Sequence, residues 1–444
     1  MSGTIWTRRA ALLGGAGMLA GCSTIDSWFG TQKDKLPGER RSIMAERRGL
    51  SVDNAAAGGP FSLPPPAAGA AWPQPGGNVT HSPGHAALSA SPGRLWRASA
   101  GSGSAYRRRL TAGPVIAEGQ VFAADAYGQV SAFDLNTGSR RWRFDTRPDD
   151  DSTGAVGAGC AFADGTLYVA TGMAEVMALD PATGKPRWRV GLSAPSRGAP
   201  AIAGSRVFVP GIDGRLTALS AEDGRQLWSY GSQATPAVPL GLPSPAVFED
   251  FLVAGFPSGE LIALRPEDGQ IIWTESLAGA GLGGLAEIFG VRGLPVIQDG
   301  RVYAIGMGGT SMAVDLRSGR RLWERELGGT ETPLPVGDWL FLVGGDGTLV
   351  AMGREDARVR WITDLNTPPE GKERDDEPAS FAAPILAGGV LILPSSKGEA
   401  LQINPSSGQV TGRLSLPGST TLPGAVAQET LVLLSDNGTL SAWR

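Results

Sequence analysis

From residue 93 onward, the chain repeats short apolar runs separated by turn residues. Segments 120–125, 206–211 and 301–306 are apolar at most positions, and each precedes a run such as 216–219 in which apolar and polar residues alternate. Alternation with period two, bounded by Gly, Asp and Asn, predicts strands rather than helices. We therefore expect an all-β fold of many short strands joined by tight turns.

One unit of this pattern recurs along the chain. Gly214 to Gly224 leads to Trp228, and related units lead to the other tryptophans at the same offset, namely Trp142, Trp188, Trp273, Trp323 and Trp361. A seventh copy has Gly412 in place of the tryptophan. The eighth stops at Trp443-Arg444, and its missing end is at Gly93–Trp96. Such spacing predicts an eight-bladed β-propeller of four-stranded blades over residues 93–444, closed by its N-terminal strand.

The repeated residues have structural roles in this prediction. The Gly before each tryptophan suits a turn that needs positive φ. The tryptophan would cover the seam between blades with its N–H paired. Ala357 stands where the sixth copy should have Gly, which costs about 1 kcal/mol if its φ is positive. We thus expect these tryptophans to pack seams rather than to bind a cofactor.

The first residues read as a targeting signal. Arg8 and Arg9 precede the apolar run 10–20, which is too short to span a bilayer. The run ends in Leu19-Ala20-Gly21-Cys22, which resembles a bacterial lipobox and implies a signal peptide over 1–21 and acylation of Cys22. An ordinary secretory signal with a chance Cys is the alternative. General and twin-arginine export both stay open.

Residues 22–92 lack a sustained period and are rich in Pro and Gly, so we expect a lipidated flexible arm there. Both histidines of the chain, His81 and His85, lie in it. They either belong to a solvated linker or ligate a metal. The charged stretch 33–48 either contacts anionic lipid head groups or a partner, or is solvated.

Composition narrows the function further. Gly is 65 of 444 residues, which disfavours helical bundles. The net charge of −4 gives no electrostatic case for nucleic acid. With two Cys and two His in the whole chain, metal or acid–base sites built on clustered His or Cys are not expected.

The repeats of residues 93–444 resemble the PQQ-like propeller repeat. With the lipobox, the chain is similar to the BamB family of outer-membrane protein assembly factors. The resemblance implies a non-enzymatic lipoprotein without a cofactor, anchored in the outer membrane at its periplasmic face. It also implies a role in the barrel-assembly (BAM) complex: binding the POTRA domains of BamA and other BAM components, and aiding the folding and insertion of nascent outer-membrane proteins.

By the same resemblance, two loops would bind the partner. In the first, Leu240-Gly241-Leu242 matches the family pattern, but Pro243 replaces its basic residue. The second carries Glu287, Ile288, Phe289 and Arg292, with one acid where the family usually has two. The leucines, Ile288 and Phe289 either anchor a partner or pack within their loops.

Two rival functions share this fold. A PQQ-dependent dehydrogenase would need a general base and a Ca²⁺ site. The recurring acids Asp180, Asp223, Asp268 and Asp315 stand instead at turn positions, and Cys160 reads as a small buried hydrophobe. A lipid-anchored propeller of another envelope complex would differ only in its partner.

Overall fold

The chain forms 32 strands and one short helix within the residues that the computed structural model describes, which are 50–106, 108–147, 157–235, 238–278, 290–368 and 377–444. All of them belong to the compact unit Arg48–Arg444. The predicted signal peptide and Cys22 lie outside the described residues.

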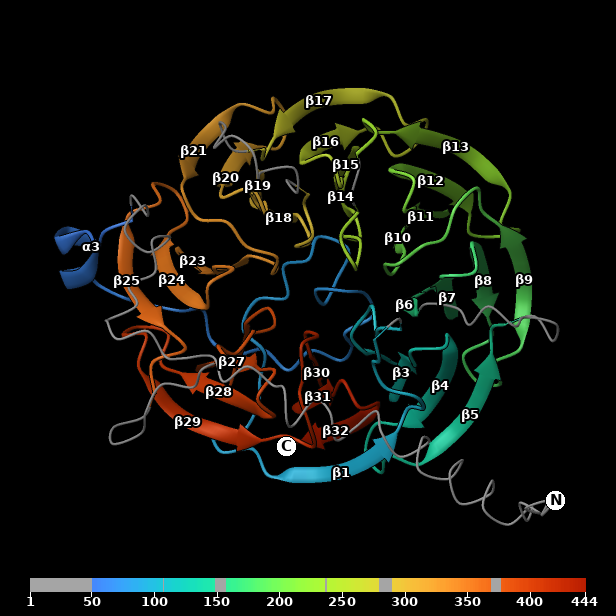
Figure 1. Cartoon of the computed structure of the whole chain (residues 1–444), viewed down its shortest axis with the longest axis horizontal. Helices are drawn as coiled ribbons and strands as arrows, with labels where there is room; N and C mark the ends of the chain where they lie inside the picture. The colour runs from blue at the N-terminus through green and yellow to red at the C-terminus, as the bar shows by residue number, and fades with distance from the viewer. Residues whose placement is uncertain (1–49, 107, 148–156, 236–237, 279–289, 369–376) are drawn as a thin grey trace, which may run out of the picture. The chain divides into compact units, whose positions relative to one another are not determined.

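The strands form eight separate four-stranded antiparallel sheets, arranged as the blades of a ring (Figure 1). Blades 1 to 4 are β2(Val115–Ala117), β3(Gln120–Ala124), β4(Gln129–Asp134), β5(Arg140–Asp145); β6(Ala158–Ala163), β7(Thr166–Thr171), β8(Glu175–Leu179), β9(Pro186–Gly191); β10(Ala201–Ala203), β11(Arg206–Pro210), β12(Arg215–Ser220), β13(Gln226–Gly231); and β14(Ala246–Phe248), β15(Phe251–Gly255), β16(Glu260–Leu264), β17(Ile271–Ser276). Blades 5 to 8 are β18(Val296–Gln298), β19(Arg301–Ile305), β20(Ser311–Asp315), β21(Arg321–Arg325); β22(Leu334–Val336), β23(Trp339–Val343), β24(Thr348–Gly353), β25(Val359–Asp364); β26(Ile385–Ala387), β27(Val390–Pro394), β28(Glu399–Ile403), β29(Val410–Ser415); and β30(Ala425–Ala427), β31(Thr430–Leu434), β32(Thr439–Trp443), β1(Arg94–Ser99). The predicted eight-bladed propeller is confirmed.

The two ends of the ring meet in blade 8. Strand β1 pairs antiparallel with β32, from Arg94 opposite Trp443 to Ser99 opposite Thr439. The N–H of Gly93 donates to the Arg444 carbonyl at 2.8 Å, and the Arg444 N–H donates back at 2.9 Å. Closure by the N-terminal strand, expected from the split repeat, is therefore confirmed.

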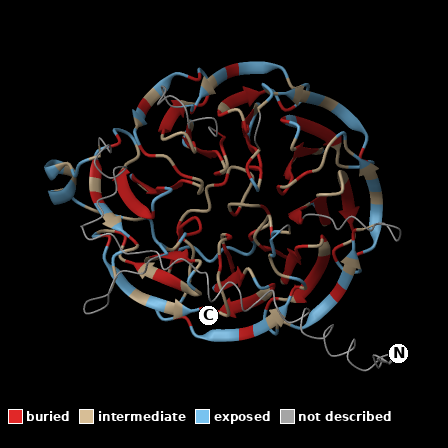
Figure 2. Ribbon diagram, in the orientation of Figure 1, coloured by how far each residue is buried: buried red, intermediate tan, exposed pale blue. Residues whose placement is uncertain are grey.

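Burial changes from the inner to the outer strand of each blade (Figure 2). Every residue of β3 is buried, because its two faces pack on neighbouring blades. The outermost strand β5 buries Trp142 and exposes most of its neighbours. The sequence reflects this, since the second strands are continuously apolar whereas the fourth strands alternate.

The repeated tryptophans join each blade to the next, as predicted. The Trp142 Nε1–H donates to the Pro181 carbonyl at 2.8 Å, in the turn of the following blade. A Cβ on Gly184 in that turn would lie 2.5 Å from the Trp142 ring, so glycine is required there. Ala357 has φ of 52°, which makes the predicted strain real at that position.

Gly412 falls at the seam where the ring closes. The turn that its tryptophan would cover is absent in blade 8, because Arg444 and Gly93, which pair across the split in the repeat, take the place of that turn. Glycine at this one position therefore follows from the split of the repeat.

The prediction of a flexible arm over 22–92 is wrong for residues 50–92. Helix α3(Asn54–Gly58) lies at the outer side of blade 6, where the Arg360 guanidinium donates to the carbonyls of Ala56 and Gly59. Phe61 stacks on Trp339 at 5.1 Å between ring centroids. Further on, Trp72, His81 and His85 are buried, so the solvated-linker reading of the histidines is also wrong.

Among the described residues, no helix has the length and apolar character needed to cross a membrane.

Candidate partner-binding rim

The loops that join consecutive blades lie at one end of the ring, because each runs from the end of an outermost strand to the start of the next innermost strand. We call the described residues of these loops the joining rim; they include 232–235, 238–245, 277–278, 290–295 and 326–333. The short turns between the first two strands and between the last two strands of each blade lie at the opposite end. The described residues of the two predicted loops, Leu240, Gly241, Leu242 and Arg292, are therefore in the joining rim.

Leu240, Gly241 and Leu242 have different roles within their loop. The Leu240 side chain is 52% exposed, whereas Leu242 is 6% exposed. The Leu242 N–H donates to the Arg197 carbonyl at 3.1 Å, which fixes the loop against blade 3. Gly241 has φ of 87°, a conformation that turns the chain between the two leucines. Of the two leucines, Leu240 is thus available to a partner and Leu242 holds the loop.

Arg292 connects the two predicted loops. Its Nε–H donates to the Leu240 carbonyl at 3.0 Å, and its Nη1–H donates to Glu331 Oε1 at 2.9 Å. Glu331 also accepts from the Thr330 hydroxyl at 2.9 Å. The Glu331 side chain is 12% exposed, so this ion pair is partly desolvated and stronger than a fully exposed one. Arg292 therefore positions the Leu240 loop. It does not take over the role of the second acid that the family pattern has in the second loop.

The sequence analysis did not single out Glu331. It lies in the next joining loop, 326–333. Three joining loops, including this one, meet at one cavity beside the ring axis. Gly241, Leu242, Arg292 and Glu331 line that cavity together with Trp72. The sequence indicates Glu331 by its position in a joining loop, two residues before Pro333. The predicted residues Glu287, Ile288 and Phe289 lie outside the described residues.

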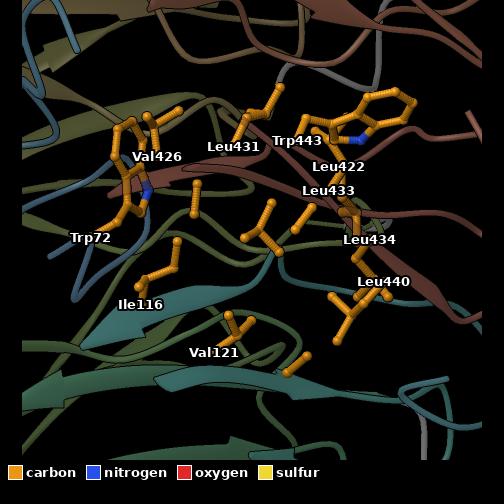
Figure 3. Packing of buried hydrophobic residues seen from close by; sticks show 14 of the residues in the cluster. Trp72, Ile116, Val121, Leu422, Val426, Leu431, Leu433, Leu434, Leu440 and Trp443 are labelled. Carbon is orange, nitrogen blue, oxygen red and sulfur yellow. The ribbon is translucent and has the colours of Figure 1, made fainter. Parts of the chain in front are cut away.

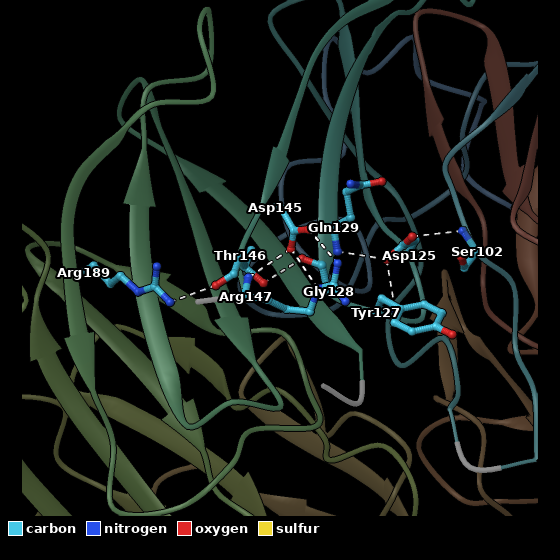
Figure 4. A network of polar contacts seen from close by, with 9 residues as sticks. All are labelled: Ser102, Asp125, Tyr127, Gly128, Gln129, Asp145, Thr146, Arg147 and Arg189. Atoms are coloured by element: carbon cyan, nitrogen blue, oxygen red, sulfur yellow. Dashed lines mark hydrogen bonds and ion pairs between the residues drawn. The ribbon is translucent and has the colours of Figure 1, made fainter. Parts of the chain in front are cut away.

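A second group of polar contacts fixes the joining rim on the far side of the ring (Figure 4). Asp125 accepts hydrogen bonds from the backbone N–H groups of Ser102, Tyr127 and Gln129 at 2.8 to 2.9 Å. The Thr146 hydroxyl donates to the Gly128 carbonyl, and Arg189 from blade 2 donates to the Thr146 carbonyl. Nearby, hydrogen bonds from Arg147 lower the pKa of the Asp145 carboxyl. These contacts link the described parts of the rim at blades 8, 1 and 2 to one another.

Two other groups with ligating or nucleophilic chemistry, His85 and Cys160, have structural roles. His85 uses both ring nitrogens, with Nδ1 on the Pro64 carbonyl at 2.8 Å and Nε2 accepting from the Gly389 N–H at 2.9 Å. Burial raises the pKa of the Cys160 thiol to about 12, as suits a buried hydrophobe. No group of three or more His, Cys, Asp or Glu that could hold a metal occurs within the described residues.

The recurring acids close turns, as the sequence predicted. Asp180 Oδ1 accepts from the N–H groups of Ala182 and Thr183 and from the Thr183 hydroxyl. The Thr183 hydroxyl is the main cause of the lowered pKa of Asp180. Asp315 makes the same turn contacts with Ser318. These carboxylates are occupied at the outer surface of the ring and face no common site.

Sequence comparison finds one family. The family described as "Outer membrane protein assembly factor BamB" matches residues 66–146 and 126–363. The BamB of Yersinia pestis is 29% identical over 364 residues, which are 80% of this chain and 89% of that relative. The BamB of Alkalilimnicola ehrlichii is 33% identical over 354 residues, which are 79% of this chain and 88% of that relative.

Structural comparison supports the fold. The crystal structure of BamB from Moraxella catarrhalis aligns with a TM-score of 0.68 at 22% identity and covers 80% of this chain and 100% of that one. The quinohemoprotein alcohol dehydrogenase from Comamonas testosteroni aligns with a TM-score of 0.66 at 14% identity and covers 84% of this chain and 80% of that one. Propeller geometry is thus shared between assembly factors and dehydrogenases, and it does not distinguish them.

Proposed function

Since this chain belongs to the BamB family of outer-membrane protein assembly factors, we propose that it is a non-catalytic scaffold of the barrel-assembly complex. Its joining rim binds a POTRA domain of BamA. By holding BamA, it aids the folding and insertion of outer-membrane proteins. The observation that carries this proposal is the exposed Leu240, presented at the rim by a loop that other contacts hold in place.

Leu240 has the properties of an interface anchor. A half-exposed leucine leaves apolar surface in contact with water. Burial of that surface under a partner would contribute about 1 to 2 kcal/mol to the free energy of binding. The Arg292–Leu240 hydrogen bond and the Leu242–Arg197 hydrogen bond fix the loop before binding. A loop that is already ordered pays less entropy on association. A rigid apolar point on a polar rim is the arrangement that interface hot spots favour.

A non-catalytic role agrees with the use of the polar groups in the ring. The recurring acids close surface turns, and the tryptophans close seams between blades. Residues 69–86 cross the ring at its axis, where backbone groups of the inner strands bond to them.

Acylation of Cys22 would anchor the ring to the outer membrane at its periplasmic face. Because the described chain packs on the ring from residue 50, residues 50–92 are not part of a tether between anchor and ring. Replacement of Cys22 by Ser should abolish incorporation of radiolabelled palmitate and release the protein from the membrane fraction. Incorporation into the variant would place the lipid elsewhere.

The partner is tested by capture of the full-length lipoprotein from its own envelope in mild detergent. We expect BamA to be recovered, and Leu240→Asp to weaken the complex by about 2 kcal/mol, or about 30-fold in Kd. Leu227→Asp is the matched control, since Leu227 is also exposed but lies in β13 near the opposite end of the ring. Recovery of a different complex without BamA would reject this function and favour the other envelope scaffold.

A further inference from the structure

The innermost strand of each blade has one edge without a neighbouring strand, and this edge faces the axis. Such edges leave backbone N–H and C=O groups that need partners when they are shielded from water. In seven blades, these edges or the turns next to them are hydrogen-bonded by one continuous stretch, Gly69–Ala86. We call this stretch the axial segment.

Its contacts fall at equivalent positions of successive blades. In blades 1 to 5 the bonded residue is the one next to last in the innermost strand. Trp72 and Ile116 exchange two backbone hydrogen bonds at 2.7 and 2.8 Å, and the Phe162 N–H donates to the Pro73 carbonyl at 2.7 Å. The Val247 and Ile297 N–H groups donate to the carbonyls of Val79 and Thr80, both at 2.9 Å. The axial segment therefore contacts the equivalent position of one blade after another around the ring.

In blade 3, a side chain replaces the backbone. The Gln74 amide accepts from the Ile202 N–H at 3.0 Å and donates to the Ile202 carbonyl at 2.9 Å, which imitates a strand. Gln74 is 6% exposed, so both hydrogen bonds are shielded from water. Both polar groups of the free edge are satisfied by one residue. This pairing is specific, because no apolar side chain of similar size could replace it.

Blades 7 and 8 also contact the axial segment, whereas blade 6 differs. Ala86 donates to the Leu386 carbonyl in blade 7, and Gly69 accepts from Gln428 in blade 8. In blade 6, the equivalent central residue is Pro335, which has no N–H to offer. Blade 6 is also the blade that the chain contacts before the axial segment begins, because Phe61 stacks on Trp339. In blade 6, therefore, the residue equivalent to the N–H donors of blades 1 to 5 cannot donate.

An apolar contact anchors the same segment. Trp72 is 6% exposed and lies beside Ile116 and Val426 in the core cluster shared by blades 7, 8 and 1 (Figure 3). Between Asp53 and Arg94 the chain has no Asp, Glu, Lys or Arg. A neutral, Pro- and Gly-containing stretch can enter the axis without the cost of burying charge.

We propose that the inner strand edges of the ring are a binding site for extended polypeptide, and that the axial segment is its built-in ligand. The ligand class is a neutral, extended chain that offers backbone carbonyls to successive blades and one aromatic anchor. Bound in this position, the segment also reaches the joining rim, since Trp72 lines the same cavity as Leu242 and Arg292. The proposal does not depend on which protein the rim binds.

Amide hydrogen exchange on the full-length protein tests it. In the variant Trp72→Ala with Gln74→Ala, we expect the amides of Phe162, Ile202 and Val247 to exchange at least about tenfold faster, while amides within β3 and β11 stay protected. Gln409→Ala, an exposed glutamine of blade 7, is the control and should change none of them. Gln74→Ala alone should affect Ile202 first, which keeps the test valid if the double variant unfolds.

A synthetic peptide of residues 66–90, added to the double variant, should restore protection of the same amides. Its tryptophan fluorescence should shift to shorter wavelength, since Trp72 is its one tryptophan. A peptide carrying the same two alanines should not restore protection. Unchanged exchange in the variant, exchange raised over the whole ring, or a peptide that does not bind would each overturn the proposal.

Discussion

At the scale of single residues, the blade seams depend on glycines that the tryptophans leave no room to replace. Gly319 has φ of 69°, and a Cβ there would lie 2.6 Å from the Trp273 ring, whose Nε1–H donates to the Leu316 carbonyl at 2.7 Å. We expect Gly319→Ala to lower the free energy of unfolding by about 1 to 3 kcal/mol, from backbone strain and overpacking. Urea unfolding followed by tryptophan fluorescence measures it.

Gly231→Ala is the matched control for that substitution. Gly231 ends β13, its φ is not positive, and no atom would lie within 4 Å of the added Cβ. Its effect should stay within about 0.5 kcal/mol. Equal effects of the two substitutions would mean that the seam tolerates the extra methyl group, as Ala357 shows for one blade.

His81 gives the second prediction at this scale. Its Nδ1–H donates to the Pro295 carbonyl at 2.7 Å, while the buried Nε2 has no partner. Burial lowers the pKa of His81 from 6.5 to about 4, so the folded state favours the neutral ring. The unfolded chain takes up the proton first, and stability is therefore lost as pH falls from about 6.5 towards 4. At pH 4.5 the loss should reach about 2 to 3 kcal/mol relative to pH 7.

The variant His81→Gln isolates this contribution. Carboxylates that titrate near pH 4 do so in both proteins, and their effect cancels in the difference. The free energy of unfolding of the variant should therefore fall less between pH 7 and pH 4.5 than that of the native protein. Parallel pH curves for the two proteins would show that His81 does not bear this titration.

At the scale of elements, the strands could be predicted and the axial segment could not. Each strand repeats a local pattern whose period sets which side chains face the neighbouring blades, so periodicity alone located all eight blades. The axial segment binds mainly through its backbone, which leaves no periodic side-chain pattern to read. Two signals remained in the sequence: an isolated Trp72 among prolines and glycines, and forty residues without a formal charge.

The candidate partner-binding site likewise could be predicted only in part from the sequence. A sequence match identified Leu240 and Leu242 equally, but only packing separates the exposed leucine from the buried one. Arg292 looked like a departure from the family's acidic pattern, and its partner Glu331 lies in another blade, 39 residues away. Contacts between joining loops follow from how consecutive blades are placed around the axis. That placement is a property of the assembled ring, which no single repeat contains.

At the scale of the whole molecule, ring closure rests on the pairing of β1 with β32, whose residues are separated by almost the entire ring. Ser99 lies opposite Thr439, and the equivalent pair inside blade 7 is Ser415 opposite Glu399. Directly opposed residues of antiparallel strands are close enough for a disulfide. A disulfide across closure constrains about 340 residues of unfolded chain, whereas the one inside blade 7 constrains about 17.

Chain entropy therefore predicts that S99C with T439C stabilises the ring more than E399C with S415C, by about 2.5 kcal/mol. Thermal unfolding of the oxidised and reduced forms of both variants measures the difference, and the within-blade pair controls for disulfide strain and for the new side chains. Equal stabilisation would mean that the unfolded chain stays compact enough to keep its ends together. A difference well above about 2.5 kcal/mol would exceed the chain-entropy effect and would show that opening of blade 8 limits the stability of the propeller.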